Sequence, residues 1–122
     1  MTKSIIRKAA AVVMAVAILA TSTVAMAQGR FRRIPAGGTH TYTAYVVAGQ
    51  PAEIVINGDG DTDLDLYVFN RFGELVAVDD DDTDYCVVRW IPRSSGTVTI
   101  RLDNLGSVYN DYVIERWAGL FQ

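Results

Sequence analysis

The sequence predicts an all-β fold, an antiparallel β-sandwich of the jelly-roll type with about seven to eight strands. Three observations support this prediction. Apolar and polar residues alternate through much of residues 39–117, turn-forming residues separate the alternating runs, and no run keeps a helical apolar stripe beyond two turns. Alternation gives each strand one buried face and one wetter face, as is typical of antiparallel sheets. The 95 residues after position 27 are enough for one domain with one core.

Residues 1–27 have the three parts of an export signal. Their basic start contains Lys3, Arg7 and Lys8. An uncharged apolar run follows, and Ala25-Met26-Ala27 fits the small-x-small cleavage pattern, so we expect cleavage before Gln28 and export to the periplasm or the medium. The alternative is an uncleaved membrane anchor, because residues 9–27 carry no charge and are just long enough to span a bilayer.

Residues 28–38 are basic, contain glycine and lack a periodic pattern, so we expect a lead-in or an edge segment. The first strand is predicted at 39–48, where Thr, Tyr and Val are frequent, and it ends at Gly49-Gln50-Pro51. The second is predicted at 53–57, where Ile54 and Ile56 share one face.

The middle of the chain predicts a hairpin. Residues 63–70 alternate strictly, and the apolar face contains Leu64, Leu66 and Val68. The sequence Asn70-Arg71-Phe72-Gly73 is a turn signal, and the next strand follows at 74–78.

Three more strands complete the sandwich. Residues 86–91 end at a Pro-Arg-Ser-Ser-Gly segment, and 97–103 alternate again. A turn at 104–107 leads into the last strand, 109–117, and residues 118–122 form a C-terminal tail.

Without the signal segment the chain has 8 arginines and 14 acidic residues, a net charge of about −6. This charge argues against nucleic acid as a partner and against stable membrane association after cleavage. It favours cations and basic partners. The single cysteine, Cys86, cannot form an internal disulfide, and we expect it to pack as a small hydrophobic residue.

Nine aspartates lie between positions 59 and 84 and form two groups. The first group leads into the third predicted strand and consists of Asp59, Asp61, Asp63 and Asp65. The second group follows the fourth predicted strand and consists of Asp79, Asp80, Asp81, Asp82 and Asp84. If 63–70 and 74–78 pair as a hairpin, both groups meet at one end of the sheet. Crowded carboxylates repel each other unless a cation is bound, and hard oxygen ligands suit Ca²⁺. The predicted calcium ligands are Asp61, Asp63, Asp65, Asp79, Asp80, Asp81 and Asp82. The alternative is a solvated acidic rim that keeps the sheet ends soluble.

Short calcium motifs do not account for the acidic groups. In an EF-hand register starting at Asp59, Leu64 stands where glycine is required and Asn70 where the bidentate glutamate belongs.

At these residues the chain resembles the bacterial pre-peptidase C-terminal domain family. Asp61-Thr62-Asp63-Leu64-Asp65-Leu66-Tyr67-Val68 is similar to its "tDlDLYv" core, and Ser95-Gly96-Thr97-Val98-Thr99-Ile100-Arg101-Leu102 to its "sGtYtirV" strand. The resemblance covers about residues 39–117 and implies a jelly-roll sandwich. Such modules usually follow secreted peptidases, and related ones bind collagen or chitin-like polymers, some with Ca²⁺. Because the signal segment abuts this module, we expect a free-standing copy.

Catalysis is not expected. His40 is the only histidine, it lies 46 positions from Cys86, and no motif links the two. Trp90 and Trp117 are expected in the core or at a sheet edge.

We expect a binding or accessory role instead, with an exported protein or an extracellular polymer as partner. The predicted binding platform consists of Tyr67, Phe69, Tyr109 and Tyr112. The alternatives are a carbohydrate- or protein-polymer binding module and an inhibitor or chaperone-like partner of an exported hydrolase.

Overall fold

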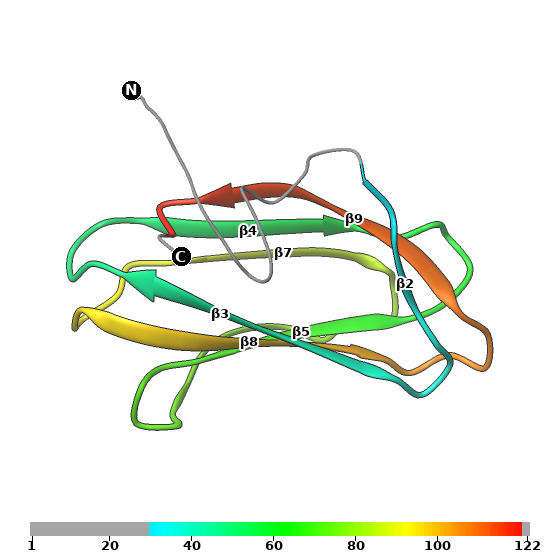
Figure 1. The fold of residues 1–122 in the computed structure, drawn as a ribbon, viewed down its shortest axis with the longest axis horizontal. Coiled ribbons are helices and arrows are strands. Elements are labelled where there is room, and N and C mark those ends of the chain that lie inside the picture. The colour runs from blue at the N-terminus through cyan, green and yellow to red at the C-terminus, as the bar shows by residue number, and fades with distance from the viewer. Residues whose placement is uncertain (1–29, 121–122) are drawn as a thin grey trace.

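The computed structural model describes residues 30–120, in which the chain forms strands and loops and no helix. The strands are β2 (Arg32–Ile34), β3 (Thr39–Val46), β4 (Ala52–Asn57), β5 (Leu64–Phe69), β6 (Leu75–Asp79), β7 (Tyr85–Trp90), β8 (Gly96–Asn104) and β9 (Asn110–Ala118). They form two four-stranded antiparallel sheets, ordered β2-β9-β4-β7 and β3-β8-β5-β6, which lie as two layers in Figure 1. The predicted all-β sandwich is therefore confirmed.

The strands pair in a nested order. The β5–β6 hairpin is innermost, and β4 with β7, β3 with β8 and β2 with β9 follow outward along the chain, each pair antiparallel. This order is that of a jelly roll. It leaves β6 and β7 at the edges of their sheets, so that within residues 30–120 β6 pairs only with β5 and β7 only with β4.

The core lies between the two sheets and is built from the inward face of each strand. The fully buried large aliphatic side chains are Ile34, Ile54, Ile56, Leu64, Leu66, Ile100 and Leu102. Burying each contributes roughly 1.5–3 kcal/mol of transfer free energy. Cys86 is buried among them as predicted, and burial raises the pKa of its thiol. Trp90 and Trp117 pack partly buried against this core, as expected.

Tyr112 contradicts one prediction, because its side chain is fully buried instead of lying on a binding surface. Its hydroxyl lies 2.7 Å from His40 Nδ1 and 2.5 Å from the hydroxyl of Tyr42. Both partners belong to β3, whereas Tyr112 belongs to β9, so these hydrogen bonds connect the two sheets. His40 is thus one of the groups that connect the two sheets.

The first and last strands lie at or next to the predicted segments. The lead-in at 28–38 contains the edge strand β2, and β9 continues to Ala118. The signal segment at 1–27 lies outside the described residues. Within residues 30–120 there is no helix of the length and apolarity needed to cross a membrane.

Candidate functional site

The first candidate feature is the acidic end, formed by residues 59–65 and 79–84. The β5–β6 hairpin brings these loops together, as predicted, by pairing Leu66 with Asp79. This register places Asp80 next to Asp65 on one side, and Asp103 of β8 pairs with Asp65 on the other. Asp103 is ion-paired with Arg101 at 3.3 Å, so the carboxylates that destabilise the charged form of Asp65 are Asp63 and Asp80.

Several of the other aspartates stabilise the loops. Asp79 Oδ2 accepts a hydrogen bond from the backbone N–H of Val87 at 2.8 Å, and Asp84 Oδ2 accepts one from Gly60 at 2.6 Å. Asp81 Oδ1 accepts the N–H of Thr83 at 3.0 Å. Charge-assisted bonds of this kind are stronger than neutral ones. Two of the predicted calcium ligands, Asp79 and Asp81, thus accept hydrogen bonds that stabilise these loops.

Asp63 and Asp65 differ from these loop carboxylates. The side chain of Asp65 is only 4% exposed, and its Oδ1 atom and that of Asp63 are buried without a hydrogen-bond partner. The Tyr67 hydroxyl donates to Asp65 Oδ2 at 3.2 Å. Burial, reinforced by the nearby Asp63 and Asp80, raises the pKa of Asp65 to about 6. The orphaned oxygens need a proton, a cation or a water molecule as partner.

The seven predicted calcium ligands do not converge on one point. Within residues 30–120 no three histidine, cysteine or acidic side chains form a group that could hold a metal ion. Asp61, Asp80 and Asp82 are exposed, whereas Asp65 is buried. The structure thus offers two orphaned carboxylate oxygens with Asp80 beside them, a donor chemistry that suits Ca²⁺ but not a complete shell of six to eight oxygens.

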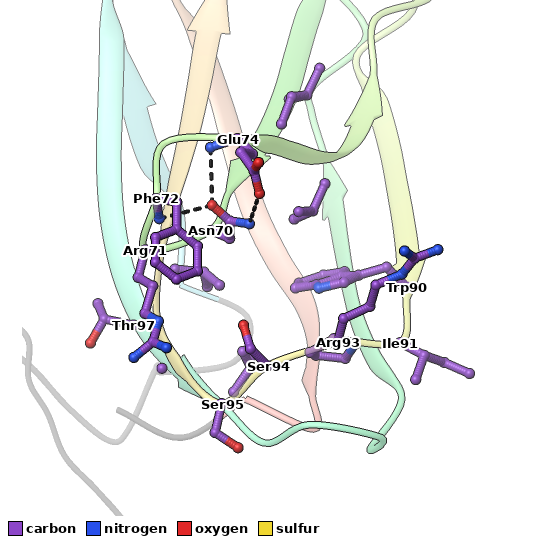
Figure 2. Close-up of a pocket in the computed structure, with 16 residues that line it drawn as sticks. Asn70, Arg71, Phe72, Glu74, Trp90, Ile91, Arg93, Ser94, Ser95 and Thr97 are labelled. Carbon is purple, nitrogen blue, oxygen red and sulfur yellow. Dashed lines mark hydrogen bonds between the residues drawn. The ribbon is translucent and has the colours of Figure 1, made fainter.

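The second candidate feature, which we call the hairpin groove, was not predicted. It has a volume of about 680 Å³ and lies between the β5–β6 turn and the loop that follows β7. Figure 2 shows Arg71 and Phe72 on one side and Trp90 and Arg93 on the other. Its volume is in the range of ligand-binding clefts, about 300–1,000 Å³.

The turn that carries Arg71 and Phe72 is held by one side chain. Asn70 Oδ1 accepts the backbone N–H bonds of Phe72 and Glu74 at 2.9 and 3.0 Å, and Asn70 Nδ2 donates to Glu74 Oε1 at 2.8 Å (Figure 2). Gly73 closes the turn at φ +81°, a left-handed conformation that favours glycine. The turn therefore fixes the backbone of Phe72, whose side chain is 66% exposed.

The groove lies at the opposite end of β6 and β7 from the acidic end. Asp79 bonds β6 to β7 near the acidic end, whereas Leu75, Val76 and Trp90 line the groove at the other end of the same strands. One feature of the sequence, a short apolar run, could have indicated this surface. The run Leu75-Val76-Ala77-Val78 is apolar at every position, although Leu75, Val76 and Val78 are all exposed.

Two arginines and one acidic residue, Glu74, line the groove, so its net charge is positive, opposite to that of the rest of the domain. Glu74 accepts a hydrogen bond from Asn70. Arg71 lies with its guanidinium 4.8 Å from the centre of the Phe72 ring. Neither Arg71 nor Arg93 forms an ion pair with any of residues 30–120, although Arg33, Arg89, Arg101 and Arg116 all do. In a chain with a net charge of about −6 over residues 28–122, two unpaired cations at one groove favour an acidic ligand group.

The predicted aromatic platform is not assembled. Tyr67 and Phe69 stack on each other on β5 with ring centres 6.4 Å apart, and the guanidinium of Arg101 lies over both rings. Tyr109 is exposed but precedes β9, which belongs to the other sheet, and the guanidinium of Arg33 lies 3.8 Å from its ring centre. The four residues therefore present no common surface.

Comparison with known proteins adds little to this description. No protein-family model matches the chain, and no curated protein matches it. Among solved structures the chain is similar to the Glycosylation Associate Protein (Gap123) complex from Streptococcus agalactiae, with a TM-score of 0.41 and 16% sequence identity. The similarity covers 74% of this chain and 40% of that chain. The chain thus spans less than half the length of that protein.

Proposed function

We propose that this chain is an exported, non-catalytic binding module that takes up its partner in the hairpin groove. The observation that carries the proposal is the exposed apolar lining of that groove. Phe72 and Ile91 are 66% and 63% exposed, and Trp90 lies between them (Figure 2). Large apolar side chains gathered around a cleft are typical of interaction surfaces. An accessory role beside exported proteins agrees with the resemblance to pre-peptidase C-terminal domains and with the signal-like residues 1–27.

We further propose that Ca²⁺ stabilises the module at its acidic end. Asp63 and Asp65 would supply carboxylate oxygens that have no partner at present, and loop carbonyls with Asp80 would add others. A bound cation removes the repulsion that these buried carboxylates otherwise experience. Calcium would then bind the folded form only.

The binding proposal is tested by affinity capture from the exported proteins of the source cells. Phe72→Asp places a charge in the groove without disturbing the core, because the side chain is exposed. Phe31→Asp is the matched control, since Phe31 is 69% exposed and lies outside the groove. We expect a partner that the unaltered chain and Phe31→Asp retain and Phe72→Asp loses. Equal retention by all three would contradict the assignment to the groove.

The calcium proposal is tested by thermal melting. Ligand at 100–1,000 times Kd stabilises by roughly 3–4 kcal/mol, which raises the Tm of a domain of this size on the order of 10 °C. Asp63→Asn and Asp65→Asn should each remove most of this shift, whereas the exposed Asp82→Asn should not. If NaCl at equal ionic strength gives the same Tm as calcium, the carboxylates form a solvated rim instead.

A further inference from the structure

We infer that the hairpin groove binds an extended segment of a partner protein that carries apolar and acidic side chains, and that this segment lies along the free edge of β6. The inference rests on the proposed binding function and specifies its ligand. It is independent of the proposal about calcium, which concerns the opposite end of the same strands.

The first reason is the open edge beside the groove. Within residues 30–120 β6 pairs only with β5, so the other side of β6 has no strand partner. Edge strands are usually protected by charged residues or proline. In β6 the one charged residue is Asp79 at the acidic end, where its carboxylate bonds to Val87 of β7, and Leu75-Val76-Ala77-Val78 beside the groove contains neither. An unprotected edge is a template to which an extended peptide adds as a further strand.

The second reason is the apolar lining that such a strand would contact. Phe72, Leu75 and Val76 come from the hairpin, and Trp90 and Ile91 from the end of β7. Successive side chains of an extended peptide point to opposite sides, so apolar residues at every second position would face this lining. Aromatic anchors such as Trp90 dominate the binding free energy of many interfaces.

The third reason is charge. Arg71 and Arg93 lie on the two sides of the groove, and neither has an ion-pair partner among residues 30–120. A Cβ atom added to Gly96 would lie 2.9 Å from Arg71 Cδ, so the glycine leaves room for the stem of Arg71 at this end of β8. Two guanidinium groups favour carboxylates over neutral sugar hydroxyls. The two arginines therefore favour an acidic peptide over a carbohydrate as the ligand.

The test is fluorescence anisotropy with the purified full-length chain and labelled octapeptides. The probe alternates valine and glutamate, and the comparison peptides alternate valine with lysine and serine with glutamate. We expect the valine–glutamate peptide to bind at least tenfold more tightly than either comparison peptide. Raising the salt concentration should weaken binding, because the arginines act through charge.

Substitutions then locate the site. Arg71→Glu and Arg93→Glu should each weaken binding of the valine–glutamate peptide about tenfold and improve binding of the valine–lysine peptide. Arg30→Glu makes the same change in net charge at an exposed position outside the groove and should have little effect. Val76→Lys should abolish binding, whereas Val108→Lys, at an exposed valine outside the groove, should not.

Other outcomes contradict the inference in distinct ways. If Arg71→Glu and Arg30→Glu weaken peptide binding equally, the attraction is non-specific electrostatic attraction and the groove is not the binding site. Tight binding of chitin or cellulose oligosaccharides without peptide binding would overturn the ligand class but leave the binding function standing. Salt-sensitive self-association that Arg93→Glu abolishes would identify a second copy of the chain as the occupant. The binding function itself would be contradicted if no peptide or oligosaccharide binds and if the unaltered chain, Phe72→Asp and Phe31→Asp also retain the same exported proteins equally.

Discussion

Asp65 shows how one residue can be positioned by the hydrophobic pattern and yet conflict with its surroundings. The alternation of β5 assigns it to the face opposite Leu64 and Leu66, and neighbouring residues then bury it. Its Oδ1 atom has no hydrogen-bond partner, and the acidic residues Asp63 and Asp80 lie close to it. Proteins usually retain such a conflict only where a ligand or a proton resolves it.

The calcium-free protein should therefore become more stable on mild acidification. Burial raises the pKa of Asp65 from 3.8 to about 6, so between these pH values the folded state binds a proton that the unfolded state does not. Stability must then fall as the pH rises through this window, by about 3 kcal/mol over the whole window and by about 1.3 kcal/mol between pH 5.0 and pH 7.0. Urea unfolding at pH 7.0 and pH 5.0 measures the difference. Asp65→Asn should remove most of it, and an unchanged pH dependence in that variant would show that Asp65 is not the source.

Tyr112 is a second residue whose surroundings determine its role. Substituting phenylalanine keeps the ring but removes the hydroxyl that contacts His40 and Tyr42. Leaving these part-buried groups without their partner should cost about 1–3 kcal/mol. Differential scanning calorimetry should show a lower Tm for Tyr112→Phe, whereas the exposed control Tyr109→Phe should melt like the unaltered protein. A stable Tyr112→Phe variant would mean that the link between the sheets contributes little.

The strands themselves could be predicted, because period-2 alternation and turn residues determine where each begins and ends. The strand predicted at 63–70 is β5 at Leu64–Phe69, and the one at 97–103 is β8. The same period explains the error at Tyr112. Tyr109 and Tyr112 are an odd number of residues apart, so an extended chain cannot present both on one face. In β9 the inward positions are Asn110, Tyr112 and Ile114.

The hairpin groove could not be predicted in this way, because it depends on two edges that belong to different sheets. Trp90 on β7 and Leu75 on β6 become neighbours only when the sandwich closes. The approach of the two acidic loops was predictable, since a single hairpin produces it. Which carboxylates stay without a partner was not predictable, because backbone N–H groups satisfy those of Asp79, Asp81 and Asp84.

The β5–β6 hairpin allows a prediction about its turn. Asn70→Ala removes two backbone-to-side-chain hydrogen bonds and the contact with Glu74. Because these groups are exposed and water can replace the partner, we expect a loss of only about 1 kcal/mol in the free energy of unfolding. Affinity for the valine–glutamate peptide should fall further, since Arg71 and Phe72 lose their fixed position. Equal affinity with and without Asn70 would show that the turn does not preorganise the groove.

At the scale of the whole molecule, the jelly roll separates two chemistries along β6 and β7. Orphaned carboxylates lie at one end, and an apolar groove with two unpaired arginines lies at the other. In Figure 1 the β5–β6 hairpin and the loop after β7 extend at the same end of the sandwich. Because the core of the sandwich separates the two ends, we expect each end to bind its ligand without changing the other.

Nuclear magnetic resonance of the ¹⁵N-labelled protein tests that claim most directly. Calcium and then the valine–glutamate octapeptide are added to one sample, and the amide shifts are followed. We predict that calcium moves signals of residues 61–65 and 79–82, and that the peptide moves a separate set at 70–76 and 90–97. Calcium shifts spread evenly over the surface, or peptide shifts centred on the acidic loops or on Tyr67 and Phe69, would contradict it.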